Sequence, residues 1–182
     1  MPAFDKRTIQ RIRVPLGFVF AILFIVFSRP TLLSLAIGSA ISVIGLAIRA
    51  WAAGHIRKAE TLAVSGPYAY TRNPLYLGSF IMGVGFTVAS GVWWLALAFA
   101  ALYLGIYLPV MRIEEDDIRE IFGADFDEYK RNVPLFVPRL SVWKATAVKF
   151  DSGLYFRYRE YRAAIGVACG IAALAAKAYF LG

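Results

Sequence analysis

The stretch LYLGSFIMGVGFTVASGVWWLALAFAALYLGIYLPVM, residues 75–111, contains no Lys, Arg, Asp or Glu. As one helix, its 37 residues would be about 55 Å long at ~1.5 Å per residue, whereas the hydrocarbon core of a bilayer is about 30 Å thick. The stretch must therefore fold back once. Ser90 and Gly91 mark the turn, because glycine interrupts a helix and the tryptophans that follow favour the membrane interface. We expect two membrane helices, at 75–89 and 92–111.

Three further apolar segments predict membrane helices. Residues 14–28 and 31–48 are uncharged and are separated by an Arg-Pro pair, in which the proline suits the start of the second helix. A fifth segment, 163–182, contains one charged residue, Lys177, whose long side chain can reach a membrane interface. The predicted fold class is therefore all-α, a polytopic membrane bundle of about five transmembrane helices.

The composition of the chain excludes several classes of protein. Apolar residues make up 59% of the 182 residues and charged residues 18%, against about 45–50% and 25% in soluble domains. A disordered chain and a disulfide scaffold are excluded, and the net charge of +8 does not call for a nucleic-acid partner. One cysteine and one histidine make neither an internal disulfide nor a thiolate or imidazole metal site, so we expect no metal.

The basic residues orient the predicted helices. Of the 20 Lys and Arg residues, 18 lie in 1–13, 49–74 and 112–162, which share one side of a five-helix topology. The positive-inside rule places the N-terminus and both long connections in the cytoplasm, and the C-terminus on the opposite side. A cleaved signal peptide is the competing interpretation of 14–28, but no small-x-small cleavage pattern follows that segment directly.

The first cytoplasmic connection, 49–74, ends in a pattern typical of a helix start. Asn73 can cap a helix and Pro74 suits its first position. The free N–H groups at such a helix start, together with the charge of Arg72, are suited to binding a carboxylate or phosphate. The alternative is that Arg72 only anchors the helix to lipid headgroups.

The second connection opens with a predicted cytoplasmic helix at 112–123, for which Gly123 is the expected stop. Its apolar face is formed by Met111, Ile118, Ile121 and Phe122. Glu114 and Glu115 border that face, and a carboxylate there needs a cationic partner. That partner is either Arg112, as a structural pair, or the ammonium group of a ligand. The residues expected to point away are Asp116, Asp117, Arg119 and Glu120.

Both connections carry longer patterns. These are G-P-Y-x-Y-x-R-N-P-x-Y-x-G at 66–78 and E-E-x-x-I-x-x-x-F-G-x-x-F-x-x-Y-x-x-x-V-P-x-x-x-P at 114–138. With the apolar hairpin between them, they resemble the isoprenylcysteine carboxyl methyltransferase and phospholipid methyltransferase family of integral membrane enzymes, over about residues 45–140. The resemblance implies S-adenosylmethionine as methyl donor in a cytoplasmic pocket between the two connections. It also implies a lipophilic acceptor from the bilayer, an isoprenoid or prenylcysteine-like carboxylate or a phospholipid amine, methylated by in-line displacement.

The resemblance also implies site residues. The donor-binding positions are Glu60, Thr61, Leu62, Ala63, Tyr68, Arg72, Asn73, Pro74, Leu75 and Glu114. Among them, Arg72 suits the donor carboxylate and Glu114 its ammonium group. The two positions expected to be catalytic are Glu115, as the base for an amine acceptor, and Arg112, as a clamp for an acceptor carboxylate.

The chain departs from the family pattern at three positions, one of which is Phe126 in place of a usual tyrosine. Asn73 stands where many relatives have histidine, and Val110 stands where the prenylcysteine enzymes have an arginine for the substrate carboxylate. The departures weaken the case for a prenylcysteine substrate more than the case for methyl transfer. Residues 1–140 are expected to form the methyltransferase core, and 141–182 a basic amphipathic connector and the fifth membrane helix.

Two other functions remain open from the sequence. One is a membrane reductase that uses NADPH on a lipid, for which Arg57 and Lys58 are the compact basic pair near the predicted site. The other is a non-enzymatic membrane module that associates through Gly166-x-x-x-Gly170 of the fifth helix. The same pattern allows a homodimer, although it also serves close packing within one chain.

Overall fold

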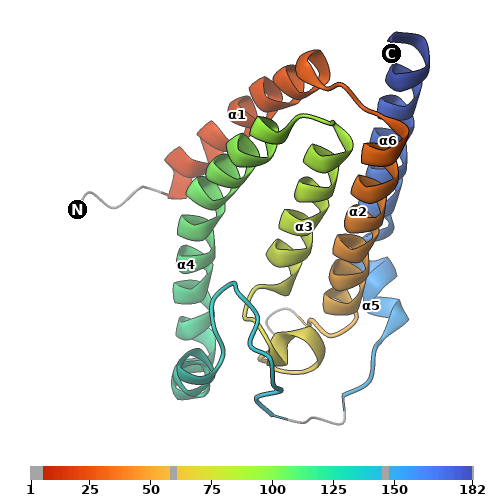
Figure 1. Cartoon of the computed structure of the whole chain (residues 1–182). Coiled ribbons are helices and arrows are strands. Elements are labelled where there is room, and N and C mark those ends of the chain that lie inside the picture. The colour runs from red at the N-terminus through yellow and green to blue at the C-terminus, as the bar shows by residue number, and fades with distance from the viewer. Residues whose placement is uncertain (1–5, 58–60, 145–147, 182) are drawn as a thin grey trace.

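The computed structural model describes residues 6–57, 61–144 and 148–181, and within them every regular element is helical. The long helices are α1 (Lys6–Phe27), α2 (Leu32–Ala53), α3 (Pro74–Ala89), α4 (Trp93–Asn132) and α6 (Tyr161–Leu181). They form a bundle, and the 3-10 helix η1 (Gly66–Ala69) and the short α5 (Ser152–Arg157) lie at one end of it (Figure 1). The prediction of an all-α membrane bundle is confirmed.

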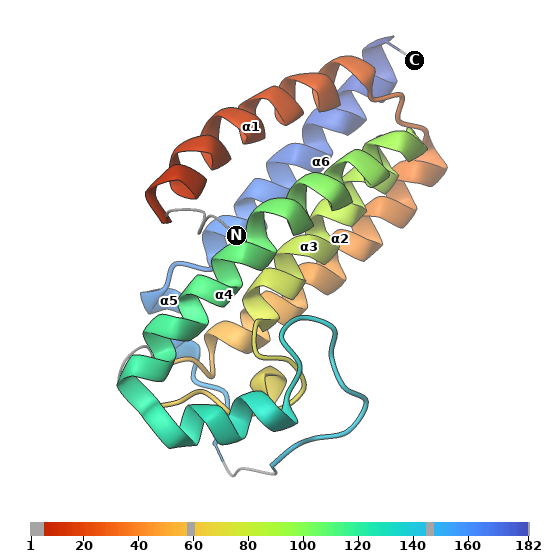
Figure 2. The ribbon, with the colours of Figure 1, turned by 90° about the vertical axis from the view of Figure 1, so that its left-hand side faces the viewer.

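Three of the described helices, α2, α4 and α6, are long and apolar enough to cross a membrane. The other two apolar helices are shorter, since α3 has 16 residues and the apolar part of α1 covers Pro15–Phe27. The long helices α1, α2, α3, α4 and α6 run along the bundle (Figures 1 and 2). That all five of these helices cross the membrane stays a prediction.

The helix expected at 112–123 is present, but it is continuous with the fourth apolar helix and not separate from it. Helix α4 continues without interruption from the membrane into this segment, and α4 as a whole ends at Asn132. Gly123 has φ +52° and ψ −122°, which is not helical, so the helix stops there as expected and a second helical segment follows in a new direction. Figure 2 shows the last part of α4 turning across the end of the bundle. The turn places both the acidic segment and the residues after Gly123 beside the first connection.

Small residues set the distance between α2 and α3. A Cβ atom on Gly85 would overlap Ser42 and the backbone of Gly38, and one on Gly45 would overlap the backbone of Gly78. The two helices therefore pack with their backbones in near contact, as small residues permit in membrane helices. This contact fixes where α2 ends and α3 begins, and so positions the loop between them.

Helix α6 is fastened to the same core. At its start, Glu160 pairs with Arg49 of α2 at 2.8 Å, and Arg49 also donates to the hydroxyl of Ser79 in α3 at 2.6 Å. Farther along, Gly170 packs against the ring of Phe86 in α3. Gly170, one of the two glycines expected to serve association, is therefore used for packing within the chain.

The charged group of Lys177 stays with the bundle and does not extend away from it. Its Nζ donates to the carbonyl of Val26 at 3.2 Å and to the hydroxyl of Ser28 at 3.1 Å. Both acceptors lie at the end of α1, where the last carbonyls of a helix have no partner within it. Lys177 thus supplies hydrogen bonds to that helix end.

Candidate functional site

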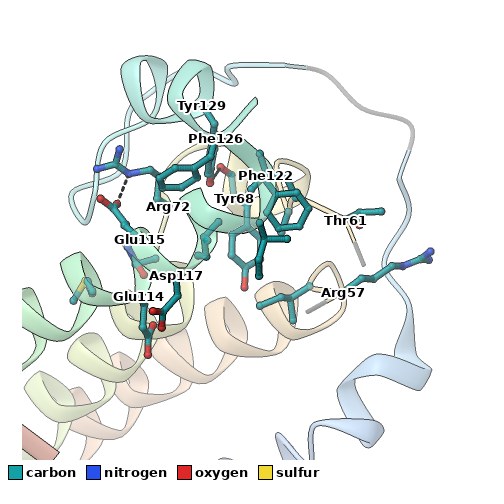
Figure 3. A pocket seen from close by; sticks show the side chains of 17 residues that line it. Arg57, Thr61, Tyr68, Arg72, Glu114, Glu115, Asp117, Phe122, Phe126 and Tyr129 are labelled. Carbon is teal, nitrogen blue, oxygen red and sulfur yellow. Dashed lines mark hydrogen bonds and ion pairs between the residues drawn. The ribbon is translucent and has the colours of Figure 1, made fainter. Parts of the chain in front are cut away.

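A cavity of about 330 Å³ lies at the end of the bundle, between the first connection and the part of α4 around Gly123 (Figure 3). Seven of the predicted donor-binding residues line it: Thr61, Leu62, Ala63, Tyr68, Arg72, Asn73 and Glu114. Pro74 and Leu75 do not, and Glu60 lies outside the described residues. Of the two positions expected to be catalytic, Glu115 lines the cavity and Arg112 does not.

The two motif segments are joined by buried side chains and backbone hydrogen bonds. The hydroxyl of Tyr129 donates to the carbonyl of Tyr68 at 2.8 Å. Phe126, Tyr129 and Val133 form a buried apolar cluster, against which Leu62 of the first connection packs. The aromatic and apolar positions of the second motif therefore close the cavity by holding the first motif against α4.

The expected helix cap at Asn73 is wrong. The Asn73 side chain makes no capping hydrogen bond, and its Nδ2 donates to the carbonyl of Leu135 at 3.1 Å. The backbone N–H of Asn73 donates instead to the hydroxyl of Thr71 at 3.4 Å. Pro74 occupies the first turn of α3, as expected. The amide of Asn73 thus connects the start of α3 to the segment after α4.

Arg72 is engaged with the wall of the cavity. Its Nε lies 2.8 Å from Oε1 of Glu115, and the two side chains are 9% and 5% exposed. Lys130 approaches the other carboxylate oxygen at 3.2 Å, and its carbonyl accepts from Arg72 at 3.0 Å. Burial lowers the pKa of Arg72, an effect that the Glu115 charge opposes. The partners of Glu115 in the structure are therefore Arg72 and Lys130, and neither of the two alternatives from the sequence, Arg112 or a ligand, is needed to pair it.

One wall of the cavity is acidic. Glu114 and Asp117 both line it, and Figure 3 shows their carboxylates beside each other, whereas Arg57 lies at the far side. Oε1 of Glu114 accepts a hydrogen bond from the hydroxyl of Tyr76 at 2.8 Å. The expectation that Asp117 points away is wrong, because residues three apart share a helix face. That spacing was the signal that could have identified it.

Tyr68 presents a buried polar atom to the cavity. Its side chain is 5% exposed, and within the described ranges its hydroxyl has no hydrogen-bond partner. Burial raises the pKa of Tyr68, so the hydroxyl stays protonated and can donate. A buried donor without a partner costs free energy, which a bound ligand would recover.

The sequence recognised Met111, Ile118, Ile121 and Phe122 as one apolar helix face but did not assign that face to the site. The lining residues that were not assigned to the site are Ile56, Arg57, Met111, Asp117, Ile118, Ile121, Phe122, Phe126 and Tyr129. Most of them lie on α4. Those before Gly123 are spaced as one face of the helix, and those after Gly123 belong to the second motif. Within the part of the chain that the structure describes, no three His, Cys, Asp or Glu side chains are grouped so as to hold a metal ion.

Comparisons with known proteins place the chain among membrane methyltransferases and a metal-resistance protein. The cobalt-zinc-cadmium resistance protein CzcN of Cupriavidus metallidurans is 38% identical over 148 residues, which are 72% of this chain and 64% of that protein. Protein-S-isoprenylcysteine O-methyltransferase of Schizosaccharomyces pombe is 27% identical over 137 residues, 72% of this chain and 58% of the relative. Methanethiol S-methyltransferase of Crocosphaera subtropica is 35% identical over 74 residues, 39% and 27% of the two chains.

The chain thus spans less than two thirds of the length of these relatives. No solved structure matches it significantly. The family model described as phospholipid methyltransferase matches residues 23–125, which include the whole first motif and the start of the second. Because this match covers more than half of the sequence and both walls of the cavity, the chain belongs to the phospholipid methyltransferase family.

Proposed function

We propose that the chain is an integral membrane methyltransferase that uses S-adenosylmethionine to methylate a lipophilic acceptor. The observation that carries the proposal is the cavity between the two motifs, with Glu114 and Asp117 on one wall and the buried hydroxyl of Tyr68 also facing it. The donor supplies a methyl group on a sulfonium cation, which an acceptor oxygen or nitrogen can attack directly. No covalent intermediate with the protein is required.

The lining of the cavity matches the chemistry of this donor. The carboxylates of Glu114 and Asp117 suit its ammonium and sulfonium cations. The rings of Phe122 and Phe126 and the side chain of Leu62 offer apolar surface for a flat adenine. Small-molecule sites have volumes of roughly 300–1,000 Å³, and the cavity volume of about 330 Å³ falls within that range.

We assign Arg72 and Glu115 to positioning. Their ion pair engages one oxygen of the Glu115 carboxylate, and Lys130 approaches the other. The pair joins the first connection to α4 across the cavity. Arg112 has no place at the cavity, so the proposal assigns it no part in binding the acceptor.

The acceptor is proposed to enter from the bilayer, because α4 runs from an apolar span into the acidic wall of the cavity. The relatives act, by their names, on isoprenylcysteine and on methanethiol. A carboxylate or thiolate acceptor needs alignment and exclusion of water, which this chain provides by closing the cavity with Phe126 and Tyr129. The cavity end of the bundle carries the basic connections, and by the positive-inside rule this supports a cytoplasmic location for the cavity.

A binding experiment tests the donor site. Glu114→Gln keeps the size of the side chain and removes its charge, and a hydrogen bond to a charged group contributes about 1.5–3 kcal/mol. We expect donor affinity, measured by calorimetry on purified protein in detergent, to fall about 10- to 100-fold. Asp116→Asn is the matched control, because Asp116 is exposed and does not line the cavity. Unchanged affinity in Glu114→Gln would reject the assignment.

A second experiment identifies the acceptor. Purified protein is incubated with donor labelled on its methyl group and a total lipid extract, and the labelled product is separated and identified by mass spectrometry. Transfer to a lipid supports the proposal. Binding of NADPH without binding of the methyl donor would favour the reductase, and binding of neither would favour a non-enzymatic module.

A further inference from the structure

The chain after α4, residues 133–143, turns back toward the helices, and we name it the return loop. Figures 1 and 2 show that it rises from the cavity end of the bundle to the level at which α3 begins. Its sequence is V-P-L-F-V-P-R-L-S-V-W, with Arg139 as the one charged residue. Val137 and Leu140 are 73% and 103% exposed.

The return loop reaches along α3. The rings of Phe136 and Phe80 lie 5.7 Å apart between their centroids. Phe80 is six residues beyond Pro74, or about 9 Å along the helix axis. With 16 residues, α3 is about 24 Å long, which is less than the hydrocarbon thickness of about 30 Å. The prediction that α3 spans the bilayer therefore requires its first turn to lie in hydrocarbon, and Phe136, which contacts Phe80, would then lie at that depth too.

Part of the loop backbone, namely three carbonyls near its start, is bonded by the protein itself. Non-helical backbone persists at membrane depth only where the protein itself bonds its polar groups. Three successive carbonyls are bonded in this way: that of Pro134 by the N–H of Arg72 at 2.9 Å, that of Leu135 by Asn73, and that of Phe136 by the hydroxyl of Thr71 at 3.0 Å. The prolines of the loop have no N–H to satisfy.

The charged residue of the loop is turned away from its apolar tip. The guanidinium of Arg139 donates to the carbonyl of Asn132 at 2.9 Å and to the hydroxyl of Ser141 at 3.2 Å. Its backbone N–H donates to the carbonyl of Tyr70 at 2.9 Å. The side chains of Val137 and Leu140, on either side of Pro138 and Arg139, are exposed.

From these observations we propose that the return loop is a membrane-inserted loop, with Val137 and Leu140 among the acyl chains of the leaflet nearest the cavity. The partner is lipid hydrocarbon, continuous with the lipid that surrounds α3 and α4. The inference does not depend on methyl transfer. An inserted loop holds the cavity beside the apolar part of that leaflet. A cavity next to a freely hydrated loop would not be held there.

Spin labelling tests the depth of the loop. In a Cys169→Ser background, Leu140→Cys carries a nitroxide, and the protein is reconstituted into phosphatidylcholine vesicles. Collision rates are measured with oxygen, which concentrates in hydrocarbon, and with a water-soluble nickel chelate. Val43→Cys, at a 59% exposed position within α2, is the lipid reference. Glu120→Cys, at an exposed position on the acidic segment of α4, is the aqueous reference.

We expect the oxygen-to-nickel ratio at Leu140 to be several-fold above that at Glu120 and close to that at Val43. A ratio at the Glu120 value, in protein whose melting temperature is unchanged, overturns the proposal. A second pair of variants gives an independent readout, since Leu140→Asp should lower the melting temperature in vesicles and the neighbouring Ser141→Asp should not. Equal melting temperatures in that pair would also contradict insertion.

Discussion

The ion pair between Arg72 and Glu115 gives the sharpest prediction about how the site is held together. Glu115→Gln keeps the shape of the side chain and removes its charge, which leaves the guanidinium of Arg72, 9% exposed, without its carboxylate. Breaking a buried pair by removing one partner costs about 3–5 kcal/mol, because the remaining charge stays out of water. Lys130 is half exposed, so losing its contact adds little. We therefore expect the free energy of unfolding to fall by about 3–5 kcal/mol.

The measurement is equilibrium unfolding of the purified protein in one detergent, followed by tryptophan fluorescence. A matched control exists on α4, where Arg119 and Asp127 pair at 2.9 Å with side chains that are 60% and 37% exposed. Asp127→Asn should cost less than about 1 kcal/mol, since water screens an exposed pair. The comparison isolates burial, because both substitutions remove one carboxylate charge from an arginine.

A double-mutant cycle then separates the pair from its surroundings. Arg72→Gln and the double variant complete the cycle, and a coupling of at least about 1 kcal/mol is expected for two residues in contact. A cost below about 1 kcal/mol for Glu115→Gln, or no coupling with Arg72, would refute the structural role. If Arg72 instead binds the donor carboxylate, Arg72→Gln should lower donor affinity and leave the unfolding free energy unchanged.

Two further predictions concern the packing and the pH range. Gly38→Ala should lower the stability measured by thermal unfolding by about 1–3 kcal/mol, because the new Cβ would overlap the backbone of Ala89. Gly166→Ala is the control, since a Cβ there meets open space, and it should leave the stability unchanged or raise it by up to about 1 kcal/mol. Since burial raises the pKa of Tyr68 above its ordinary value of about 10, its contribution to stability should be complete below about pH 10 and should decline above it, where the unfolded chain ionises first. Tyr68→Phe should flatten this alkaline decline in a pH series of melting temperatures, and an identical decline would contradict the assignment.

The membrane helices could be predicted because their signal is local. An uncharged run longer than the bilayer is thick must fold back, and the corner at Ser90 and Gly91 follows from residues at that place. The extent of α4 could not be predicted in the same way. Gly123 correctly indicated a break in the helix, but the helix resumes because Phe126 and Tyr129 gain burial against the first connection. A local pattern contains no information about that surface.

The errors within the site have one physical cause. Spacing along the chain offers Glu115 only the cations of its own helix, such as Arg112, whereas its closest partner is Arg72, which is distant in the sequence. Likewise Asn73 stands where a helix cap is favoured, but the carbonyl of Leu135 competes for its amide. The contacts that a polar side chain makes near a chain reversal depend on residues that are distant in the sequence. The sequence indicated that these positions matter, but it did not indicate which residues they contact.

Arg72 shows why the cavity and the return loop form one unit. Its side chain holds Glu115 on the cavity wall, and its backbone N–H holds Pro134 at the base of the return loop. Its neighbours Thr71 and Asn73 bond the next carbonyls of the same loop. A change that withdrew the loop from the membrane would therefore act directly on the residue that positions the cavity wall. In this arrangement the position of the return loop and the geometry of the cavity wall are both tied to Arg72, so a shift of the loop should also move the wall.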